Sequence, residues 1–238
     1  VNILEGSTAV AFITYYSNKS REYIFHINDT PAVKIKKPHD PDVDSTGYFH
    51  LMGCSLFMNP DFCHEIMSTL YAFVEKGYKI SFDPNIRTEL LKGDDFASTI
   101  APVMANCTVL LPGEQELYTV SGETDIESAA RSLFATYAKL EVIAVKLGSK
   151  GCRIITREDD LFIDAIKIKE VDPTGAGDCF DAGFLVGLIN GKSLRDSAAI
   201  ASAAGAINAS AFGPMEGELS LHNIQKILQG TAYEQVKL

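Results

Sequence analysis

The sequence predicts an α/β fold with a mainly parallel sheet. From residue 47 onward, short apolar runs alternate with amphipathic segments of helix length, which is the pattern of strands and the helices that cover them. The chain has 238 residues, of which 46% are hydrophobic and 22% are charged. One large domain, or one domain with an appendage, is therefore expected. This composition excludes collagen-like, low-complexity and largely disordered chains.

Two strands joined as a hairpin are expected near the start of the chain. Thr8–Tyr16 and Arg21–Ile27 are rich in β-branched and aromatic residues, and a polar Ser-Asn-Lys-Ser stretch separates them. Three prolines among lysines and aspartates then indicate a loop or linker over residues 31–46. We expect a β segment with its linker in residues 1–46, followed by an α/β domain in residues 47–238.

The strands of the main sheet are predicted from four apolar runs, Tyr48–Met52, Lys79–Phe82, Thr108–Leu111 and Val142–Val145. Two further strand-like runs follow, Cys152–Thr156 and Leu161–Ile168. Residues 60–76 carry apolar side chains at helical spacing before the stop signal Gly77, and residues 125–140 repeat the pattern. Such stripes are typical of a buried helix face rather than of a cofactor site. A further helical region begins near Gly177.

The charge pattern limits the partners that can be expected. The chain has 21 Lys and Arg against 31 Asp and Glu, a net charge of −10 with the acids scattered, so nucleic acid is not an expected partner. The five cysteines form no Cys-x-x-Cys pair and are expected to be free thiols in a reducing cytoplasm. No apolar stretch reaches the roughly 18–20 residues of a membrane span, so no membrane partner is expected.

The segment Val171–Phe184 combines the features of an anion site. We expect a strand to end here in a Gly-rich turn, with a helix following. The N–H groups of Gly175, Ala176 and Gly177 would approach an anion at the positive end of that helix. Asp178 either stabilises the helix dipole or acts as a base beside a bound phosphate. The segment is neither a Walker A motif nor the dinucleotide fingerprint, because the required residues are absent.

These residues also resemble a known family. Asp172-Pro-Thr-Gly-Ala-Gly-Asp-Cys-Phe180 is similar to the signature of the ribokinase-like (PfkB) carbohydrate kinases. The resemblance implies a three-layer α-β-α fold with a small β lid at residues 8–27. It also implies that Gly175–Gly177 form the anion hole for the transferred phosphoryl group and that Asp178 is the catalytic base. Asp172 and Thr174 match positions near a monovalent-cation site, K⁺ in particular.

A polar segment after the second predicted sheet strand fits the same family. Ser81-Phe-Asp-Pro-Asn-Ile-Arg87 resembles the family's Asp-x-Asn-x-Arg, so Asp83, Asn85 and Arg87 are the expected substrate-binding residues. The carboxyl end of a parallel strand is where open α/β sheets bind ligands. Arg87 would pair either with a carboxylate or phosphate of the substrate or with a structural carboxylate, and both alternatives are open.

Two further segments resemble the nucleotide side of the family. Ala144-Val-Lys-Leu-Gly-Ser-Lys-Gly151 is similar to the strand and loop that line the phosphates and ribose of ATP. The ATP-binding residues implied by the resemblance are Lys146, Gly148, Ser149, Gly151 and Asn208, the last of these near adenine in the small-residue helix of residues 193–212. Lys146 or Lys150 is expected to neutralise phosphate charge.

The resemblance implies a Mg²⁺ ion held mainly through water. Leu111-Pro-Gly-Glu-Gln-Glu-Leu117 resembles the family's Asn-x-x-Glu, with Gly113 at the Asn position and Glu116 retained. A metal bound mostly through water needs few direct protein ligands, so Glu116 remains the expected magnesium residue.

The function predicted from the sequence is ATP-dependent phosphorylation of a small sugar or sugar acid of the 2-keto-3-deoxygluconate, fructose or ribose type. Family members begin with a further region that holds a Gly-Gly substrate motif, and this chain resembles the part after it. A non-catalytic nucleotide- or sugar-binding fragment or regulator is the alternative, and a Rossmann-type oxidoreductase is a weaker third. A homodimer is expected through the exposed apolar lid strands, where Tyr15, Tyr16 and His26 either pack or touch sugar.

Overall fold

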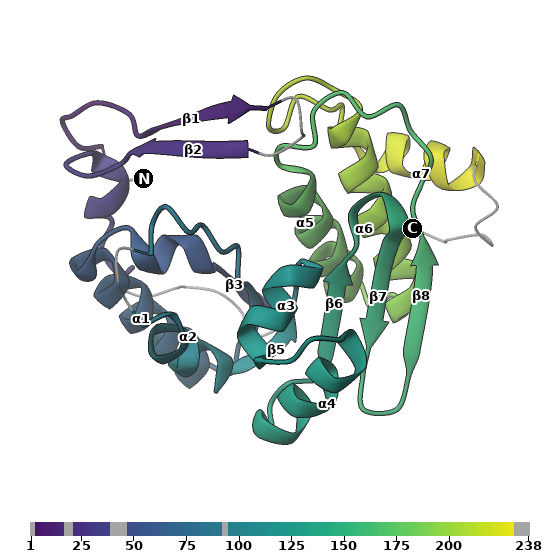
Figure 1. Cartoon of the computed structure of the whole chain (residues 1–238), viewed down its shortest axis with the longest axis horizontal. Coiled ribbons are helices and arrows are strands. Elements are labelled where there is room, and N and C mark those ends of the chain that lie inside the picture. The colour runs from purple at the N-terminus through teal and green to yellow at the C-terminus, as the bar shows by residue number, and fades with distance from the viewer. Residues whose placement is uncertain (1–2, 17–20, 39–46, 92–94, 231–238) are drawn as a thin grey trace.

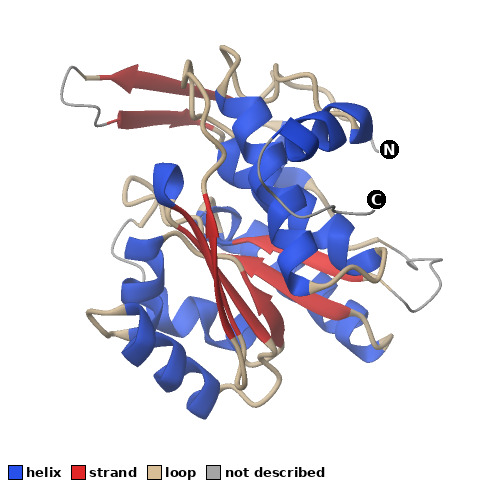
Figure 2. Cartoon of the chain, turned by 90° about the vertical axis from the view of Figure 1, so that its right-hand side faces the viewer, coloured by secondary structure: helices blue, strands red, loops and turns tan. Residues whose placement is uncertain are grey.

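The structure, a computed structural model, describes residues 3–16, 21–38, 47–91 and 95–230. These residues form a small two-stranded sheet and a six-stranded sheet with helices on both of its faces (Figure 1; Figure 2). The linker expected up to residue 46 lies partly in residues 39–46, outside the described residues. Its first part folds into a short 3₁₀ helix, η1 (Pro31–Lys34).

The small sheet is the predicted hairpin of β1 (Val10–Tyr15) and β2 (Arg21–His26), which pair antiparallel. Phe12 lies opposite Ile24, and both side chains are exposed, at 60% and 62%. On the opposite face Phe25 packs against the main core. The hairpin prediction is confirmed, and the Ser-Asn-Lys-Ser stretch between the strands lies outside the described residues.

The main sheet has the strand order β3-β4-β5-β6-β7-β8. The strands are β3 (Tyr48–Met52), β4 (Lys79–Asp83), β5 (Cys107–Leu110), β6 (Val142–Lys146), β7 (Gly151–Ile155) and β8 (Asp160–Asp164). The first four run parallel and the last two are added antiparallel. The predicted, mainly parallel sheet is therefore confirmed. Its last strand ends at Asp164 rather than at the predicted Ile168.

Helices on the two faces complete three layers. The first face carries α1 (Pro60–Glu75), α2 (Phe96–Met104), α3 (Glu114–Ser121) and α4 (Ile126–Thr136). The second face carries α5 (Ala176–Ile189) and α6 (Leu194–Ala209), with α7 (Leu221–Gly230) packed on α6. Side-chain caps fix the starts of five of these helices, because Asn59, Asp95, Asp125, Ser193 and Ser220 each accept a hydrogen bond from a first-turn backbone N–H. No described helix is long and apolar enough to cross a membrane.

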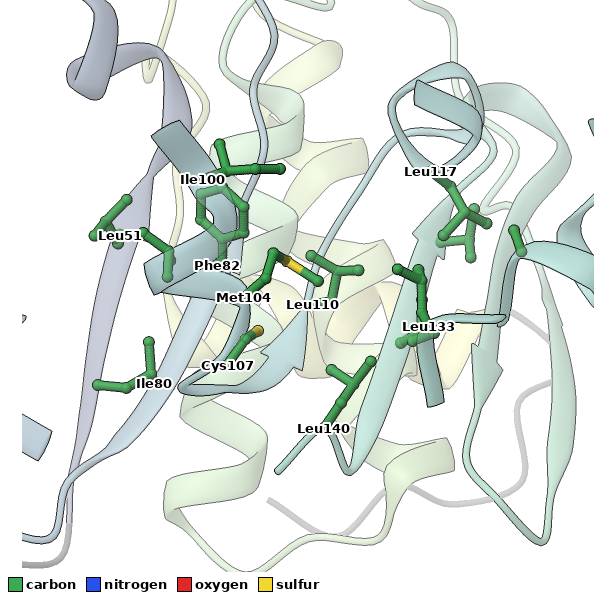
Figure 3. Packing of buried hydrophobic residues seen from close by; sticks show 14 of the residues in the cluster. Leu51, Ile80, Phe82, Ile100, Met104, Cys107, Leu110, Leu117, Leu133 and Leu140 are labelled. Carbon is green, nitrogen blue, oxygen red and sulfur yellow. The ribbon is translucent and has the colours of Figure 1, made fainter. Parts of the chain in front are cut away.

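The two cores follow from the alternation of side chains along the strands. In β6, Ile143 and Val145 point to the first face, whereas Val142 and Ala144 point to the second. The first face packs on Met104 and Leu133 of its helices (Figure 3). The second face packs on phenylalanines of α5. Because both faces are covered, the central strands are apolar on both sides, which is why they were recognisable in the sequence.

Polar residues replace this apolar pattern at one place on the second face. Ile80 and Phe82 of β4 point into the first core, so Ser81 and Asp83 point the other way and are nevertheless buried. His50 of β3 lies beside Ser81, with its Nδ1 atom 3.0 Å from Oγ of the serine. The carboxyl end of the sheet thus has a buried polar surface that needs partners of its own.

The prediction of a strand before the Gly-rich turn is wrong. Residues 165–171 have no strand structure, and the backbone N–H groups of Val171 and Asp172 donate to the carbonyl of Ala209. The segment runs to the end of α6 instead of joining the sheet, because its hydrogen bonds are already used there. Among the described residues, which include all five cysteines, no disulfide bond is formed.

Candidate active site

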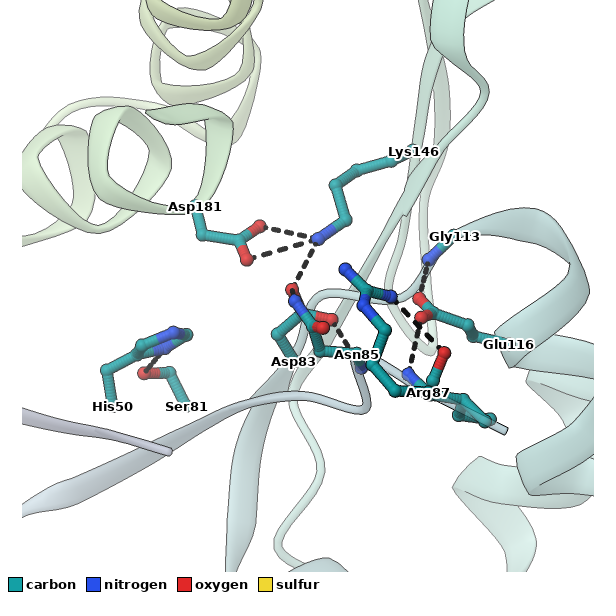
Figure 4. A network of polar contacts seen from close by, with 10 residues as sticks. His50, Ser81, Asp83, Asn85, Arg87, Gly113, Glu116, Lys146 and Asp181 are labelled. Carbon is teal, nitrogen blue, oxygen red and sulfur yellow. Dashed lines mark hydrogen bonds and ion pairs between the residues drawn. The ribbon is translucent and has the colours of Figure 1, made fainter. Parts of the chain in front are cut away.

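The polar end of the sheet lies beside the start of α5 (Figure 4). β4 ends at Asp83 and β6 ends at Lys146, while α5 begins at Ala176 in the Gly-rich turn. Parallel strands bring their carboxyl ends to the same edge, and a helix starting there directs its unpaired N–H groups toward them. The fold therefore gathers residues that are about a hundred positions apart in the sequence.

The Gly-rich turn is held in a fixed shape. Gly175 is the N-cap of α5 with φ of 77°, a left-handed conformation that favours glycine. The Asn208 side chain donates to the carbonyl of Thr174 at 2.8 Å, and a Cβ atom at position 175 would lie 3.3 Å from that amide nitrogen. The first helical bond runs from Cys179 N to the carbonyl of Gly175, so the N–H groups of Gly177 and Asp178 come before any helical acceptor. This arrangement suits an anion.

Asp178 projects from the first turn of α5 at the edge of the site. Its side chain reaches solvent, yet the protein around it displaces enough water to raise its pKa above the ordinary value, and the charge of Asp83 adds to this. Lys146 and Arg87 act in the opposite direction without cancelling the rise. A carboxylate with a raised pKa is a better proton acceptor than an ordinary aspartate.

A buried ion triad joins the two strands to the helix. The ammonium of Lys146 lies 2.9 Å from Oδ2 of Asp83 and 3.1 Å from both carboxylate oxygens of Asp181. Burial alone would lower the pKa of Lys146, but the two carboxylates outweigh it and raise that pKa. Burial raises the pKa of Asp181, whereas Lys146 holds the pKa of Asp83 below its ordinary value despite burial.

The turn after β4 is organised by Asp83. Oδ1 of Asp83 accepts from the backbone N–H of Asn85 at 3.0 Å, and Asn85 has the left-handed φ of 38°. The next N–H, that of Ile86, donates to Glu116 at 2.8 Å. The other carboxylate oxygen of Glu116 accepts from the N–H of Gly113 at 2.7 Å, so Glu116 ties the start of α3 to this turn. Residues 83–87 are thus held by side chains on both sides.

Arg87 ends this segment with a partly buried guanidinium. It lies over the ring of Tyr23 from β2, 5.2 Å from the ring centre, and donates to the carbonyl of Ile86 at 3.2 Å. Within the described ranges no carboxylate lies within ion-pair distance of it. The structural ion pair weighed from the sequence is thus not formed among these residues, and the guanidinium remains available to an anionic group.

The residues expected to bind ATP do not gather at one point. Lys146 faces Asp83 and Asp181 across the sheet end, whereas Gly148 and Ser149 are exposed in a 3₁₀ turn, η3 (Gly148–Lys150). Gly151 is buried with φ of 115°, and a Cβ atom there would lie 2.0 Å from the carbonyl oxygen of Ile163. Asn208 is fully buried against the Gly-rich turn. Their roles toward the nucleotide stay predictions.

Asp172 links the hairpin to the Gly-rich turn. Its Oδ1 accepts from Thr174 N at 2.9 Å and from the hydroxyl of Tyr15 at 3.0 Å, and its Oδ2 accepts from Gly213 N at 3.2 Å. The hydroxyls of Tyr15 and Thr174 are 2.6 Å apart. Burial would raise the pKa of Asp172, but these hydrogen bonds keep it below the ordinary value. β1 therefore reaches the start of the anion turn.

Sequence reasoning missed Asp181 and did not foresee the contact of Tyr15. Asp181 is a carboxylate in the otherwise apolar and small-residue segment Phe180–Leu185, one turn after Asp178. A charged residue on the buried face of a helix is expected to have a partner, and this was the available signal. His50 was also missed. Burial lowers the pKa of His50, which favours the neutral ring beside Ser81.

Comparisons with known proteins place the chain in one family. Residues 1–220 match the family described as pfkB family carbohydrate kinase. The Arabidopsis thaliana protein named “Probable fructokinase-4” is 28% identical over 94% of this chain and 71% of its own length. The Archaeoglobus fulgidus protein named “Uncharacterized sugar kinase” is 30% identical over 89% of this chain and 80% of its own length.

Solved structures show the same fold. An E. coli protein described as a ribokinase II, in complex with ATP and Mg²⁺, has a TM-score of 0.82 and 28% identity over 94% of this chain and 72% of its own. A Vibrio cholerae fructokinase with fructose, ADP and calcium has a TM-score of 0.81 at 21% identity, over 92% of this chain and 73% of its own, and supports the fold alone. The chain belongs to the pfkB family of carbohydrate kinases. The sugar-kinase class expected from the sequence is confirmed.

Proposed function

We propose that this chain transfers the γ-phosphoryl group of ATP to a hydroxyl group of a small sugar or sugar acid. The observation that carries the proposal is the position of Asp178, a carboxylate with a raised pKa on the first turn of α5, where the N–H groups of Gly177 and Asp178 precede any helical acceptor. A complex of the E. coli relative with ATP and Mg²⁺ supports this choice of phosphoryl donor.

Asp178 takes the proton from the substrate hydroxyl as the oxygen attacks the γ-phosphorus. The new bond joins the sugar oxygen to phosphorus, the bond to the β-phosphate oxygen breaks, and ADP leaves while the proton stays on Asp178. The N–H groups of Gly175 and Gly177 stabilise charge on the phosphoryl oxygens during the transfer. The N–H group of Ala176, also expected in the anion hole, donates to the carbonyl of Pro173 at 3.2 Å in this structure. Asp83, Asn85 and Arg87 bind and orient the substrate.

Magnesium would be held through water near Glu116, where it would offset phosphate charge. Both oxygens of this carboxylate already accept backbone N–H groups, which fits an ion that keeps its own water shell.

A monovalent cation such as K⁺ would lie by Asp172 and Thr174, next to the buried Oδ1 of Asn208, for which no hydrogen-bond partner is found among the described residues. Gly148, Ser149 and Gly151 would lie along the nucleotide, and Asn208 would act through the Gly-rich turn.

The guanidinium of Arg87 favours a sugar acid over a neutral sugar. It is partly buried, stacked on Tyr23 and without a carboxylate at ion-pair distance in the described part of the chain. An acid of the 2-keto-3-deoxygluconate type would supply that carboxylate as a planar match to the guanidinium. Fructose and ribose remain in the substrate panel because relatives are named as fructokinases and as a ribokinase.

The test is ADP release from Mg-ATP with fructose, ribose and 2-keto-3-deoxygluconate. We expect turnover with one of them and a loss of about 10²–10⁴ in kcat in Asp178→Asn, with ATP affinity unchanged. Full activity in Asp178→Asn would contradict the proposal. Binding of a non-hydrolysable ATP analogue without turnover of any sugar would favour the alternative of a non-catalytic fragment.

A homodimer through the hairpin extends the proposal. Phe12 and Ile24 stand on the outer face of β1 and β2 and are exposed, as is part of Val10. An apolar face of this kind is stabilised when a second copy covers it. Light scattering should show a dimer that Phe12→Ser/Ile24→Ser converts to a monomer. The five cysteines form no disulfide bond among the described residues, which supports a reducing compartment such as the cytoplasm. The domain boundary at residue 46 stays a prediction.

A further inference from the structure

We propose that Lys146, paired with Asp181, is a positioning residue that holds Asp83 and the 83–87 segment in place for the sugar. The inference rests on the proposed function, because it assigns that segment to the substrate. It differs from the nucleotide role expected for Lys146 from the sequence. The contacts that carry it are the three between Lys146 and the two carboxylates.

The geometry explains why a lysine is used. β5 lies between β4 and β6, so the two strands are about 10 Å apart at a spacing of about 4.8 Å per strand. An aspartate at the end of β4 cannot cross this distance, whereas the four-carbon stem of a lysine on β6 does. Lys146 follows Ala144 on the second face, so its side chain leaves the strand toward Asp83 and α5.

The contacts of Lys146 with Asp83 and Asp181 are called the pin below, and burial makes the pin rigid. The side chains of Asp83 and Asp181 are 2% exposed and that of Lys146 is 16% exposed, so little water competes for the contacts. Lys146 has a bidentate contact with Asp181 and a single contact with Asp83. The other oxygen of Asp83 therefore remains directed at the N–H of Asn85. The left-handed turn at Asn85 depends on that hydrogen bond.

The same pin relates the substrate segment to the proposed base. Asp178 and Asp181 are three residues apart on α5, which places them on neighbouring turns of one helix face. A contact that fixes Asp181 relative to Asp83 also fixes the first turn of α5 relative to residues 83–87. Loss of the pin should therefore weaken sugar binding and slow transfer, while leaving ATP binding intact.

The test is the double variant Lys146→Met/Asp181→Leu in the full chain, which removes one charge of each sign from the buried triad. We expect KM for the substrate found in the panel to rise at least tenfold and KM for ATP to change less than twofold. The matched control is Lys79→Met/Glu141→Leu, which removes an exposed ion pair of the same sheet and should change neither. If the double variant does not fold, Lys146→Gln must show the same split.

A tenfold rise in KM for ATP with no change in KM for the sugar would overturn the proposal and indicate that Lys146 binds the phosphates of ATP. A change of less than twofold in both KM values would overturn the proposal as well. If the wild type turns over no sugar, the proposed function fails, and hydrogen exchange of residues 83–90 decides the positioning role. Exchange there must accelerate at least tenfold while residues 151–164 stay unchanged, and unchanged exchange at 83–90 would overturn the proposal.

Discussion

The Gly-rich turn is contacted by two regions that use hydrogen bonds to carboxylates in opposite settings. At the sheet end, Lys146 binds Asp83 and Asp181 where the side chains are almost wholly buried. At the hairpin, Tyr15 binds Asp172 although Tyr15 itself is 50% exposed. Water competes for the second contact but hardly for the first. The comparison indicates a pre-organised sheet end and a hairpin held by contacts that are easily exchanged for water.

The largest difference between the two regions should appear on removal of the buried cation. Lys146→Met leaves two carboxylates together in the sheet end, and we expect a loss of about 3–5 kcal/mol in the free energy of unfolding. Urea unfolding monitored by circular dichroism measures this. The exposed pair gives the control, since Lys79→Met should cost about 0–1 kcal/mol. Equal losses in the two variants would contradict the comparison.

The second-largest loss of stability should come from a methyl group added where the sheet end is tightly packed. A Cβ atom at Gly53, the first residue of the 3₁₀ helix η2 (Gly53–Phe57), would lie 2.1 Å from the carbonyl oxygen of Pro84. Gly53→Ala must therefore displace the turn between Asp83 and Asn85, with a loss of about 1–3 kcal/mol in stability and a loss of turnover. Gly230→Ala is the matched control, because no atom lies within 4 Å of its added methyl group. Thermal unfolding that is unchanged in Gly53→Ala would show that this turn adapts.

A substitution at the hairpin should reduce turnover by less than the changes at the sheet end and should leave the stability of the fold unchanged. Tyr15→Phe removes the hydroxyl that contacts Asp172 and Thr174, each of which keeps other partners. A partly buried hydrogen bond is worth about 0.5–1.5 kcal/mol, so kcat/KM should fall roughly twofold to tenfold with an unchanged melting temperature. Tyr71→Phe, at an exposed tyrosine of α1, is the control. A drop in melting temperature would mean that the hairpin contact supports the fold itself.

The last prediction concerns the pH dependence of turnover in a variant that is expected to stay folded. The base form of Asp178 is populated above its raised pKa, so turnover should fall as the pH drops through that value. Arg87 lowers the pKa of Asp178, and Arg87→Met should therefore move the acidic limb of kcat to higher pH. A pH–rate profile of both proteins at saturating substrate measures the displacement. A limb that stays in place, or moves to lower pH, would show that Asp178 is not the titrating base.

Much of the fold was predictable because its signals are local. The hairpin, the parallel strands and helices α1 and α4 follow from patterns of apolar residues within a few turns of chain. α3 was missed because it is short and only Leu117 on it is buried, and α2 was missed because Pro102 lies within it. The false strand before residue 172 shows the limit, because the hydrogen bonds of that segment go to Ala209 rather than to a strand.

The sequence by itself determined the alternation of strands and helices, the Gly-rich turn with Asp178 and the order of the polar segments. These depend on neighbours along the chain, which a sequence displays directly. Only the tertiary structure decided that Lys146 faces Asp83 and Asp181, that Glu116 holds Ile86, and that Tyr15 reaches Asp172. The partners of these groups are 30 to 157 residues away, and a buried charge binds whichever opposite charge the fold places beside it.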